Sequence, residues 1–361
     1  MISPAFWPRI GGVERHVARV SKELAARGHQ VTVLTSTRRR DLPARERLGA
    51  VDVVRFAPLD LPLSTRIRRA WVAWRCFRRA DVVHFHDAET FEEFYWWKRF
   101  WLPRRPLFCT FHGFGRFPVP PELAARKQRL SAHVRGSICI GAFISKWYGV
   151  EPAFVSYGGV DVPDRVEPAG SSDLIFVGRL APDTGIQVCL EALHLLRRDH
   201  GLSLSLRVLG DGPLRESLER YSAEHHLEVT FHGFVAEPMP WLAGAKASFA
   251  TGYLTMLEAM AAGKPVFAVY THDLKRDYLQ MSPFAKYVTI VGSAEALAAQ
   301  LQAIWPPRPD QPPLTAARRF ALEHTWDRVA DTYLALYARG GVIEARLDNV
   351  RPAGAGLFPL P

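Results

Sequence analysis

The chain has 361 residues, of which 48% are hydrophobic and 23% charged, and it carries a formal net charge of +10. This length and composition favour two globular domains, and the sequence lacks the run of about 18 apolar residues that a membrane-spanning helix needs. The first residues, MISPAFWPRIGG, lack the basic start and apolar core of a signal peptide. Four scattered cysteines without metal-ligand spacing favour buried free thiols in a reducing cytosol.

Strands and helices alternate from the N-terminus onward, which is typical of parallel α/β folds. After Gly11 and Gly12, apolar residues recur at helical spacing from Val13 to Leu24, and Gly28 ends this helix. Only MISPAF precedes the glycine turn, so we expect either a short first strand or a wrongly assigned start codon. Apolar runs predict the further strands of a first Rossmann-like domain, at residues 30–36, 51–56, 81–86, 106–113 and 137–141.

A second series of strands follows, at residues 173–179, 204–212, 228–234, 246–251, 264–269 and 287–291. Helices are expected between them, notably at 185–199 and 213–225. Gly, Pro and Ser cluster between the two series in VSYGGVDVPDRVEPAGSSD, which marks a domain boundary. We therefore predict an N-terminal domain at 1–155, a C-terminal domain at 156–339 and a loosely ordered tail at 340–361.

Basic and aromatic residues are dense between Arg66 and Arg105. Cationic side chains attract anionic lipid head groups, and Trp and Tyr favour the membrane interface. The segment therefore predicts contact with an anionic membrane surface. The alternative is a solvated charged face with its aromatic residues packed in a core. Nucleic acid is not expected as a partner, because the sequence has no recognition motif for it.

Seven segments, in order along the chain, resemble the retaining glycosyltransferases of family 4: PRIGGVERHV, DVVHFH, TFHG, FVGRLAPDTG, LRVLGDGPLRESLE, VTFHGF and LEAMAAGKPV. The resemblance implies an α/β fold of two facing Rossmann-like domains, the GT-B fold, with an interdomain cleft. It also implies transfer of a sugar from a nucleotide-sugar donor with retention of configuration. Ligands of α/β folds bind at the carboxyl ends of strands, so the candidate residues are sought there.

Arg179 comes at the end of a predicted strand, where a guanidinium can grip a diphosphate with two hydrogen bonds. The family pattern has a Lys five residues later, which here is Thr184, a possible hydroxyl donor without charge. Gly11 and Gly12 permit close approach of the backbone to the donor phosphates. The alternatives are an interface ion pair for Arg179 and a plain strand-to-helix turn for the two glycines.

Glu258 matches the second carboxylate of the family's Glu-x7-Glu motif, which holds the ribose hydroxyls, while Ala250 replaces the first, which would touch the sugar. Backbone N–H groups of Leu254 and Thr255 are expected to bind the diphosphate at a helix start. Glu258 alternatively serves only to complement the charge of that helix end. Three further donor contacts are expected: Gly210, chiefly a tight turn, and the base-contacting pair Phe234 and Val235.

His112 in TFHG ends a strand, and the resemblance places it beside the reacting sugar carbon. A neutral imidazole there is suited to hydrogen-bond the sugar or to shuttle a proton. His84 and His86 are possible site residues that we expect on opposite faces of their strand, with at least one of them structural. Asp87 either orients a histidine or starts the next helix.

Neither a metal nor another cofactor is expected, because the fold uses cationic side chains and helix dipoles to stabilise the diphosphate. The leading hypothesis is a hexosyl- or deoxyhexosyl-type transferase, peripheral at the inner face of the cell membrane, that acts on a lipid-linked or glycan acceptor in cell-surface glycan synthesis. The replaced Lys and Glu suggest an altered donor sugar. The second hypothesis is a catalytically impaired scaffold or regulator of an active transferase. A third, an epimerase or hydrolase on the same fold, fits the sequence least.

Overall fold

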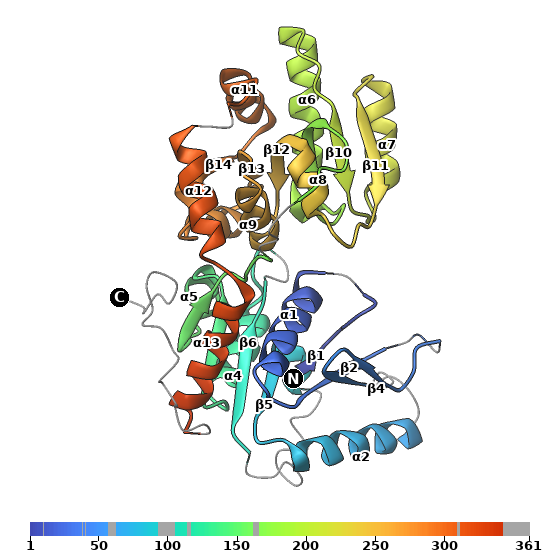
Figure 1. Ribbon diagram of the computed structural model, residues 1–361, viewed down its shortest axis with the longest axis vertical. Coiled ribbons are helices and arrows are strands. Elements are labelled where there is room, and N and C mark those ends of the chain that lie inside the picture. The colour runs from blue at the N-terminus through green and yellow to red at the C-terminus, as the bar shows by residue number, and fades with distance from the viewer. Residues whose placement is uncertain are drawn as a thin grey trace. The chain divides into compact units, whose positions relative to one another are not determined.

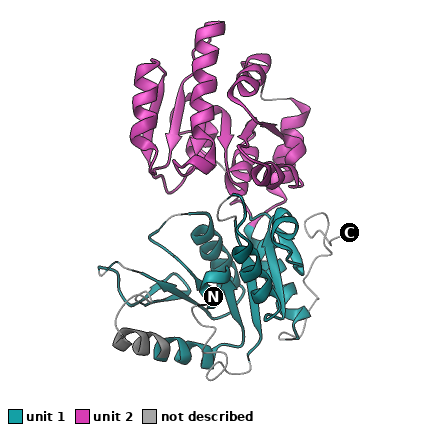
Figure 2. Cartoon of the chain, turned by 180° about the vertical axis from the view of Figure 1, so that it is seen from behind, with its two compact units in different colours: residues 1–158, 326–361 teal, residues 159–325 magenta. Residues whose placement is uncertain are grey.

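The computed structural model describes residues 1–9, 11–37, 39, 41–56, 63–92, 105–113, 117–161, 166–308 and 311–341, without the side chains of 63–70. The chain forms two compact units (Figure 2). Unit 1 comprises Met1–Gly158 together with Trp326–Pro361, and unit 2 comprises Gly159–Thr325. Residues 93–104 of the predicted basic and aromatic segment, and residues 342–361 of the predicted tail, lie outside the described residues.

Unit 1 contains an eight-stranded sheet of order β3-β4-β2-β1-β5-β6-β7-β8. Only β3 is antiparallel to its neighbour. Its strands are β1 (Ile2–Ser3), β2 (Val31–Ser36), β3 (Arg45–Leu48), β4 (Val51–Phe56), β5 (Val83–His86), β6 (Leu107–Phe111), β7 (Gly136–Ile140) and β8 (Phe154–Ser156). Its helices are α1 (Gly12–Ala26), α2 (Leu63–Arg79), α4 (Pro121–Ser131), α5 (Phe143–Tyr148) and α13 (Trp326–Arg339) (Figure 1).

The predicted strands of the first domain are confirmed as β2, β4, β5, β6 and β7. The first strand is short and nevertheless central, since Ile2 pairs with Leu34 of β2 and with Phe85 of β5. The edge strand β3 was not predicted from the sequence. Its residues, RERL, are mostly charged, as is usual for an exposed strand at a sheet edge.

Unit 2 contains a six-stranded parallel sheet of order β11-β10-β9-β12-β13-β14, the strand order of a dinucleotide-binding Rossmann fold. Its strands are β9 (Ser172–Val177), β10 (Leu206–Leu209), β11 (Val229–Gly233), β12 (Ala245–Ala250), β13 (Val266–Val269) and β14 (Val288–Val291). Its helices are α6 (Ile186–His200), α7 (Arg215–Glu224), α8 (Met239–Gly244), α9 (Tyr253–Ala261), α10 (Asp273–Gln280), α11 (Ala294–Ile304) and α12 (Pro312–Leu322), with short 3-10 helices η1 (Pro182–Thr184) and η2 (Ala285–Tyr287). The six predicted strands and the two predicted helices of this domain are confirmed.

The domain boundaries differ from the prediction, because α13 belongs to unit 1 and not to the C-terminal domain. Its apolar stripe, which includes Tyr333 and Tyr337, is buried, and the helix packs against α1, β7 and β8. An amphipathic pattern indicates that a helix covers a sheet but does not indicate which sheet. The unit boundary itself falls between Gly158 and Gly159, within the predicted linker.

Among the described residues, every helix falls short of the length or the apolarity that a bilayer-spanning segment requires. The described part of α2 carries Trp71, whose side chain is 53% exposed, beside the buried Phe77. The Arg75 guanidinium lies 4.6 Å from the Trp71 ring centroid, and that of Arg78 lies 4.8 Å from the Trp74 ring centroid. One face of α2 therefore presents cations stacked on indole rings.

The assignment of α13 to unit 1 can be tested with Tyr333→Ala. Tyr333 is fully buried, and removal of a large core side chain costs about 3–5 kcal/mol of unfolding free energy. Hydrogen exchange followed by mass spectrometry should show faster exchange in unit 1 and unchanged exchange in unit 2. The matched variant is Leu301→Ala in α11, equally buried, which should affect unit 2 alone. Loss of protection in unit 2 from Tyr333→Ala would contradict the assignment.

Candidate active site

Two neighbouring strands of unit 1 end in polar residues at the same edge of the sheet. His86 ends β5, and His112 directly follows β6. Their rings meet, with Nδ1 of His86 and Nε2 of His112 2.9 Å apart. The backbone N–H of His112 donates to Oδ1 of Asp87 at 3.1 Å, and Nζ of Lys127 on α4 donates to the same oxygen at 2.7 Å. The Asp87 carboxylate therefore fixes the position of His112 by accepting from the backbone N–H of His112.

His84 and His86 lie on the same face of β5, with their ring centroids 5.1 Å apart. The expectation of opposite faces was wrong, because residues two apart on a strand point to the same side. His84 hydrogen-bonds the Thr110 hydroxyl at 2.8 Å and the Tyr337 hydroxyl at 3.0 Å. With both ring nitrogens engaged and only 1% of its surface exposed, His84 is a structural residue.

The hydrogen bonds of His84 continue through Thr110 to helices α13 and α1. The Thr110 hydroxyl also bonds the Tyr333 hydroxyl at 2.8 Å, which in turn meets Nε2 of His16 on α1 at 2.9 Å. We call His16, His84, His86 and His112 the buried histidine cluster. Among the described residues, no group of three or more His, Cys, Asp or Glu side chains is arranged to hold a metal ion.

Burial controls the charge of this cluster. Desolvation lowers the pKa of His16, His84 and His86 well below 6.5, and neighbouring histidines add to the effect. The pKa of His112 falls to about 3, because of burial first and of the Lys127 charge second. His112 is therefore neutral near pH 7. A ring with this pKa is suited to hydrogen bonding and not to proton shuttling.

Gly11, the N-cap of α1, and Gly12, its first residue, lie in the same unit. Gly11 has an extended backbone and no side chain to cap the helix. A Cβ on Gly12 would meet nothing within 4 Å, so open space surrounds it. The first N–H groups of a helix lack intrahelical partners and attract anions. The carboxylate of Glu14 in the first turn lies against Gly11 and pairs with Arg9 at 3.2 Å, so a negative charge already lies at this helix start. Contact of the two glycines with donor phosphates stays a prediction.

In unit 2, Arg179 follows the carboxyl end of β9, and its side chain is 62% exposed. Its guanidinium donates to Oδ2 of Asp183 at 2.7 Å, within one loop and not across an interface. Exposed ion pairs contribute little stability. Because a guanidinium has five N–H donors, the pair with Asp183 is compatible with a second, anionic partner.

Glycine at position 210 fixes the loop that carries Arg179. A Cβ at Gly210 would lie 1.8 Å from the Gly178 carbonyl oxygen, and the φ of Gly210 is +155°. A Cβ at Gly212 would lie 2.4 Å from the carbonyl oxygen of Leu180. The two glycines therefore let one turn lie directly against the backbone on both sides of Arg179.

Thr184 does not replace the missing lysine. Its residue is buried in η1, and its hydroxyl donates to the Ala181 carbonyl at 2.6 Å. A hydroxyl has a single proton to donate, so Thr184 has none left for a phosphate. The hydroxyl proton of Thr184 is used within its own turn, and a donor contact from Thr184 stays a prediction.

The segment from β12 into α9 keeps only part of the carboxylate motif. Ala250 ends β12 and is 1% exposed, and Glu258 lies in α9, 3% exposed. Leu254 and Thr255 occupy the first turn of α9, at the same sheet edge as Arg179 because β12 pairs with β9. Glu258 lies beyond this first turn, in the second half of the helix. Simple charge complementarity at the helix start therefore does not explain this carboxylate.

The start of α9 has an additional partner from α10. Gly252 caps the helix without a side-chain hydrogen bond. The backbone N–H of Tyr253 instead donates to the Tyr278 hydroxyl at 2.9 Å, and the two rings stack with centroids 4.0 Å apart. The Tyr253 N–H is thus not available to an anion, which leaves the N–H groups of Leu254 and Thr255 for this role.

Phe234 and Val235 follow β11, at the same sheet edge. Phe234 is 55% exposed, which is unusual for a phenylalanine. The residue before it, Gly233, forms a β-bridge with Gly210. Phe234 therefore presents an aromatic face near the turn that holds Arg179, and its contact with a base stays a prediction.

The residues of these sites that were not predicted include His16, Lys127 and Tyr333, and also Lys275 on α10, whose Nζ donates to the Thr251 carbonyl at 2.7 Å. His16 lies in PRIGGVERHV beside Val17, and its place on the buried face of α1 was a usable signal. Lys127 and Lys275 carry no such signal, because the groups they bond lie 40 and 24 residues away along the chain. Tyr333 comes from the helix that the sequence assigned to the other domain.

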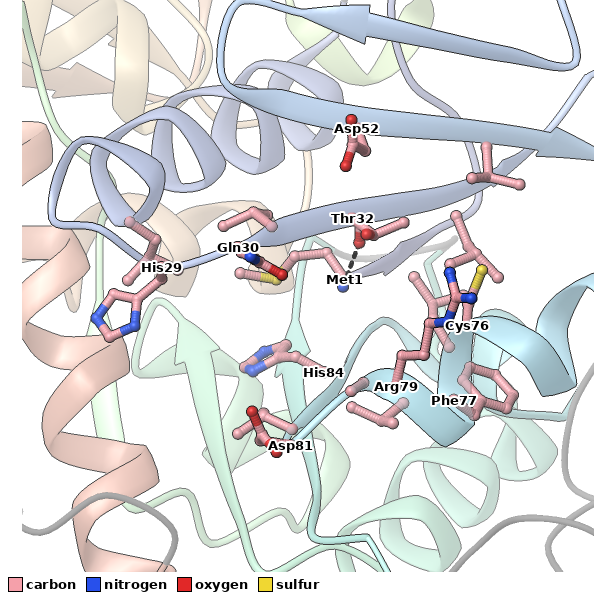
Figure 3. Close-up of a pocket in the computed structure, with 18 of the residues that line it drawn as sticks. Met1, His29, Gln30, Thr32, Asp52, Cys76, Phe77, Arg79, Asp81 and His84 are labelled. Carbon is pink, nitrogen blue, oxygen red and sulfur yellow. Dashed lines mark hydrogen bonds between the residues drawn. The ribbon is translucent and has the colours of Figure 1, made fainter.

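A cavity of about 900 Å³ lies in unit 1. Figure 3 shows Met1, Thr32, His84 and Arg79 around it. Its lining comes from the amino ends of β1, β2 and β5, the sheet edge opposite to His86 and His112. Ligands of parallel α/β folds bind at carboxyl ends, so we do not assign this cavity to the candidate site.

The buried histidine cluster makes the fold acid-sensitive. Unfolded histidines, with pKa near 6.5, bind protons that the folded cluster does not, so the unfolding free energy should fall as pH drops from 7 toward 5. In His86→Gln the slope should become shallower by up to about 1.4 kcal/mol per pH unit. Urea unfolding at pH 5, 6, 7 and 8 measures it. The control is His29→Gln, because His29 is exposed. Equal slopes in wild type, His86→Gln and His29→Gln would show that the buried histidine cluster is not the source of the acid sensitivity.

Two family models match the chain: Glycosyltransferase Family 4 at residues 10–162 and Glycosyl transferases group 1 at residues 171–305. A phosphatidyl-myo-inositol mannosyltransferase from Propionibacterium freudenreichii subsp. shermanii is 26% identical over 382 residues, with 94% of each chain covered. The first match lies almost entirely in unit 1, and the second lies within unit 2.

Solved structures agree in fold. Sucrose-phosphate synthase from Thermosynechococcus elongatus has a TM-score of 0.73 at 18% identity, covering 91% of this chain and 93% of its own. HepE from Anabaena, in complex with UDP and glucose, has a TM-score of 0.69 at 16% identity, covering 92% and 97%. Because the two family matches together span most of the sequence and the fold agrees, the chain belongs to the family 4, group 1 glycosyltransferases of the GT-B fold.

Proposed function

We propose that the protein transfers a hexosyl or deoxyhexosyl residue, with retention, from a nucleoside-diphosphate sugar to a lipid-linked acceptor at an anionic membrane surface. The observation that carries the proposal is the exposed Arg179 guanidinium at the carboxyl end of β9, next to the start of α9. A cation and a helix start at one sheet edge are suited to a departing diphosphate. No metal is assigned a role.

In this reaction the bond between the sugar's anomeric carbon and the diphosphate oxygen breaks. The acceptor oxygen bonds the same carbon from the same face, and its proton passes to the departing phosphate. Arg179 and the α9 start stabilise the negative charge that develops, Glu258 accepts from the ribose hydroxyls, and Phe234 and Val235 contact the base. The neutral ring of His112 in unit 1 offers a hydrogen bond to the sugar.

The lipid-linked acceptor is supported by two observations. The relative from P. freudenreichii is named a phosphatidyl-myo-inositol mannosyltransferase, so its acceptor is a lipid. The exposed Trp71 and the Arg–Trp stacks of α2 match the chemistry of an anionic interface. We therefore place the reaction at the inner face of the cell membrane, in the assembly of a surface glycan.

A non-catalytic scaffold is the second candidate. It is favoured by Ala250, which removes a sugar-binding carboxylate, and by Thr184, whose hydroxyl is used internally. The two candidates differ in nucleotide binding. A thermal-shift panel of UDP, GDP, ADP and dTDP should raise the melting temperature with at least one of them, and a flat response to all four would favour the scaffold.

Arg179→Ala tests the transferase directly. Loss of charge stabilisation should lower turnover at least ~10²-fold, measured by mass spectrometry of products from nucleotide sugars offered with polyprenyl-diphosphate and phosphatidylinositol acceptors. Arg198→Ala is the control, because Arg198 is also exposed and paired, with Asp199, but lies at the far end of α6. Turnover unchanged by Arg179→Ala would refute the role given to this guanidinium.

Membrane contact through α2 is tested by vesicle co-sedimentation. The double variant Arg75→Glu, Arg78→Glu should weaken binding to vesicles of phosphatidylglycerol and phosphatidylcholine in equal parts by about tenfold or more, since each basic residue near such a surface contributes about 1 kcal/mol. Vesicles of phosphatidylcholine alone should bind weakly throughout. Arg197→Glu, Arg220→Glu changes the net charge equally on exposed positions of unit 2, and equal loss in both variants would point to net charge and not to α2.

A further inference from the structure

The carboxyl ends of three neighbouring strands of unit 2 meet around one buried lysine. Gly178 follows β9, Thr251 follows β12, and Lys275 lies in the first turn of α10 after β13. Nζ of Lys275 donates to the Thr251 carbonyl at 2.7 Å. A Cβ at Gly178 would lie 3.1 Å from the Thr251 hydroxyl. Lys275 is thus bonded to the turn that leads into α9 and that lies against the Arg179 loop.

The backbone of Lys275 is held as firmly as its side chain. The ring of His272, the N-cap of α10, accepts the Lys275 N–H at 3.1 Å. The ammonium lies 4.4 Å from the centroid of the Tyr278 ring, whose hydroxyl binds the start of α9. Lysines are almost never fully buried without a partner, and Lys275, which is only 4% exposed, is held by the Thr251 carbonyl and the Tyr278 ring.

The charged groups around Lys275 are those of the donor site. Burial lowers its pKa to about 8, Asp183 raises the pKa and Arg179 lowers it. Other titratable groups lie beside Lys275. The pKa of His272 is lowered chiefly by burial and then by Lys275, and is raised by Asp183 and Asp273, while burial raises the pKa of Tyr278. Lys275 and Arg179 therefore repel each other and share Asp183, an arrangement that favours a bound dianion.

We propose that Lys275 supplies the second positive charge for the donor diphosphate, in place of the lysine that is absent at position 184. The inference rests on the proposed function and adds to it a residue from a different helix. The physical reason is the charge of the leaving diphosphate, which Arg179 alone would compensate with a single cation. The charge that is missing from the β9 loop thus comes from α10.

A purely structural role is the competing explanation, and Lys264 provides its control. Nζ of Lys264 also donates to a backbone carbonyl, that of Ala243, at 2.8 Å, and burial also lowers the pKa of Lys264. Lys264 lies just before β13, at the amino edge of the sheet and so away from the candidate site. Lys264→Met therefore removes the same kind of hydrogen bond and charge without approaching a diphosphate.

Calorimetry with the tightest-binding of UDP, GDP, ADP and dTDP, and with the matching monophosphate, tests the proposal. At pH 7, Lys275→Met should weaken diphosphate binding about tenfold, or about 1.4 kcal/mol, and monophosphate binding less. Lys264→Met should leave both affinities unchanged. Equal diphosphate affinity of wild type and Lys275→Met would overturn the role of Lys275 while leaving the transferase proposal intact.

The pH dependence separates a charge role from a structural one. Anion binding favours the ammonium form, so wild-type affinity should be highest below about pH 8 and fall as pH rises above it. Lys275→Met should lack this fall, and Lys275→Arg should keep its affinity at pH 9, because a guanidinium stays charged. A fall that persists in Lys275→Met would overturn the inference. If wild type binds none of the four diphosphates, this inference and the proposed function fail together.

Discussion

The candidate donor site of unit 2 depends on the direct approach of two stretches of backbone. Gly210 and Gly212 lie against the Gly178 and Leu180 carbonyls at distances that leave no room for a Cβ. The Leu180 N–H completes this contact by donating to the Asp211 carbonyl at 3.0 Å. Because the turn and the loop are joined through main-chain atoms, the guanidinium of Arg179 leaves the sheet edge from a fixed position. Phe234, Thr251 and Lys275 are all positioned around this loop through neighbouring strands.

Charge at this edge is distributed over several elements. The β9 loop carries Arg179 and Asp183, and the hydroxyl of Thr184 satisfies only its own turn. The buried ammonium of Lys275 reaches the same place from α10. Electrostatic interaction depends on distance and environment and not on chain connection. A cation on another loop can therefore stabilise the same diphosphate if it lies at a similar distance from it. Loss of a motif residue is therefore weaker support for lost activity than it looks in the sequence alone.

In unit 1, by contrast, polar side chains are buried beside an apolar sheet. One hydrogen-bonded chain runs from Tyr337 through His84, Thr110 and Tyr333 to His16, which offsets the cost of burying these groups. His86 and His112 form a separate pair. The result is a set of neutral rings beneath the sheet edge, with His112 at its end. The same burial that fixes the orientation of His112 removes its ability to carry a proton near pH 7.

The sequence by itself determined the α/β class, most strands of both sheets and the residues at their carboxyl ends, because apolar periodicity and glycine turns are local properties. Arg179 and His112 were predicted at strand ends, and Glu258 was predicted from the resemblance to the family's motif. Only the tertiary structure decided that α13 covers unit 1, that His16 packs beside His86 and His112, and that Lys275 lies near Arg179. Each of these depends on contacts between residues far apart along the chain, and periodicity encodes which face of an element is buried but not what it is buried against.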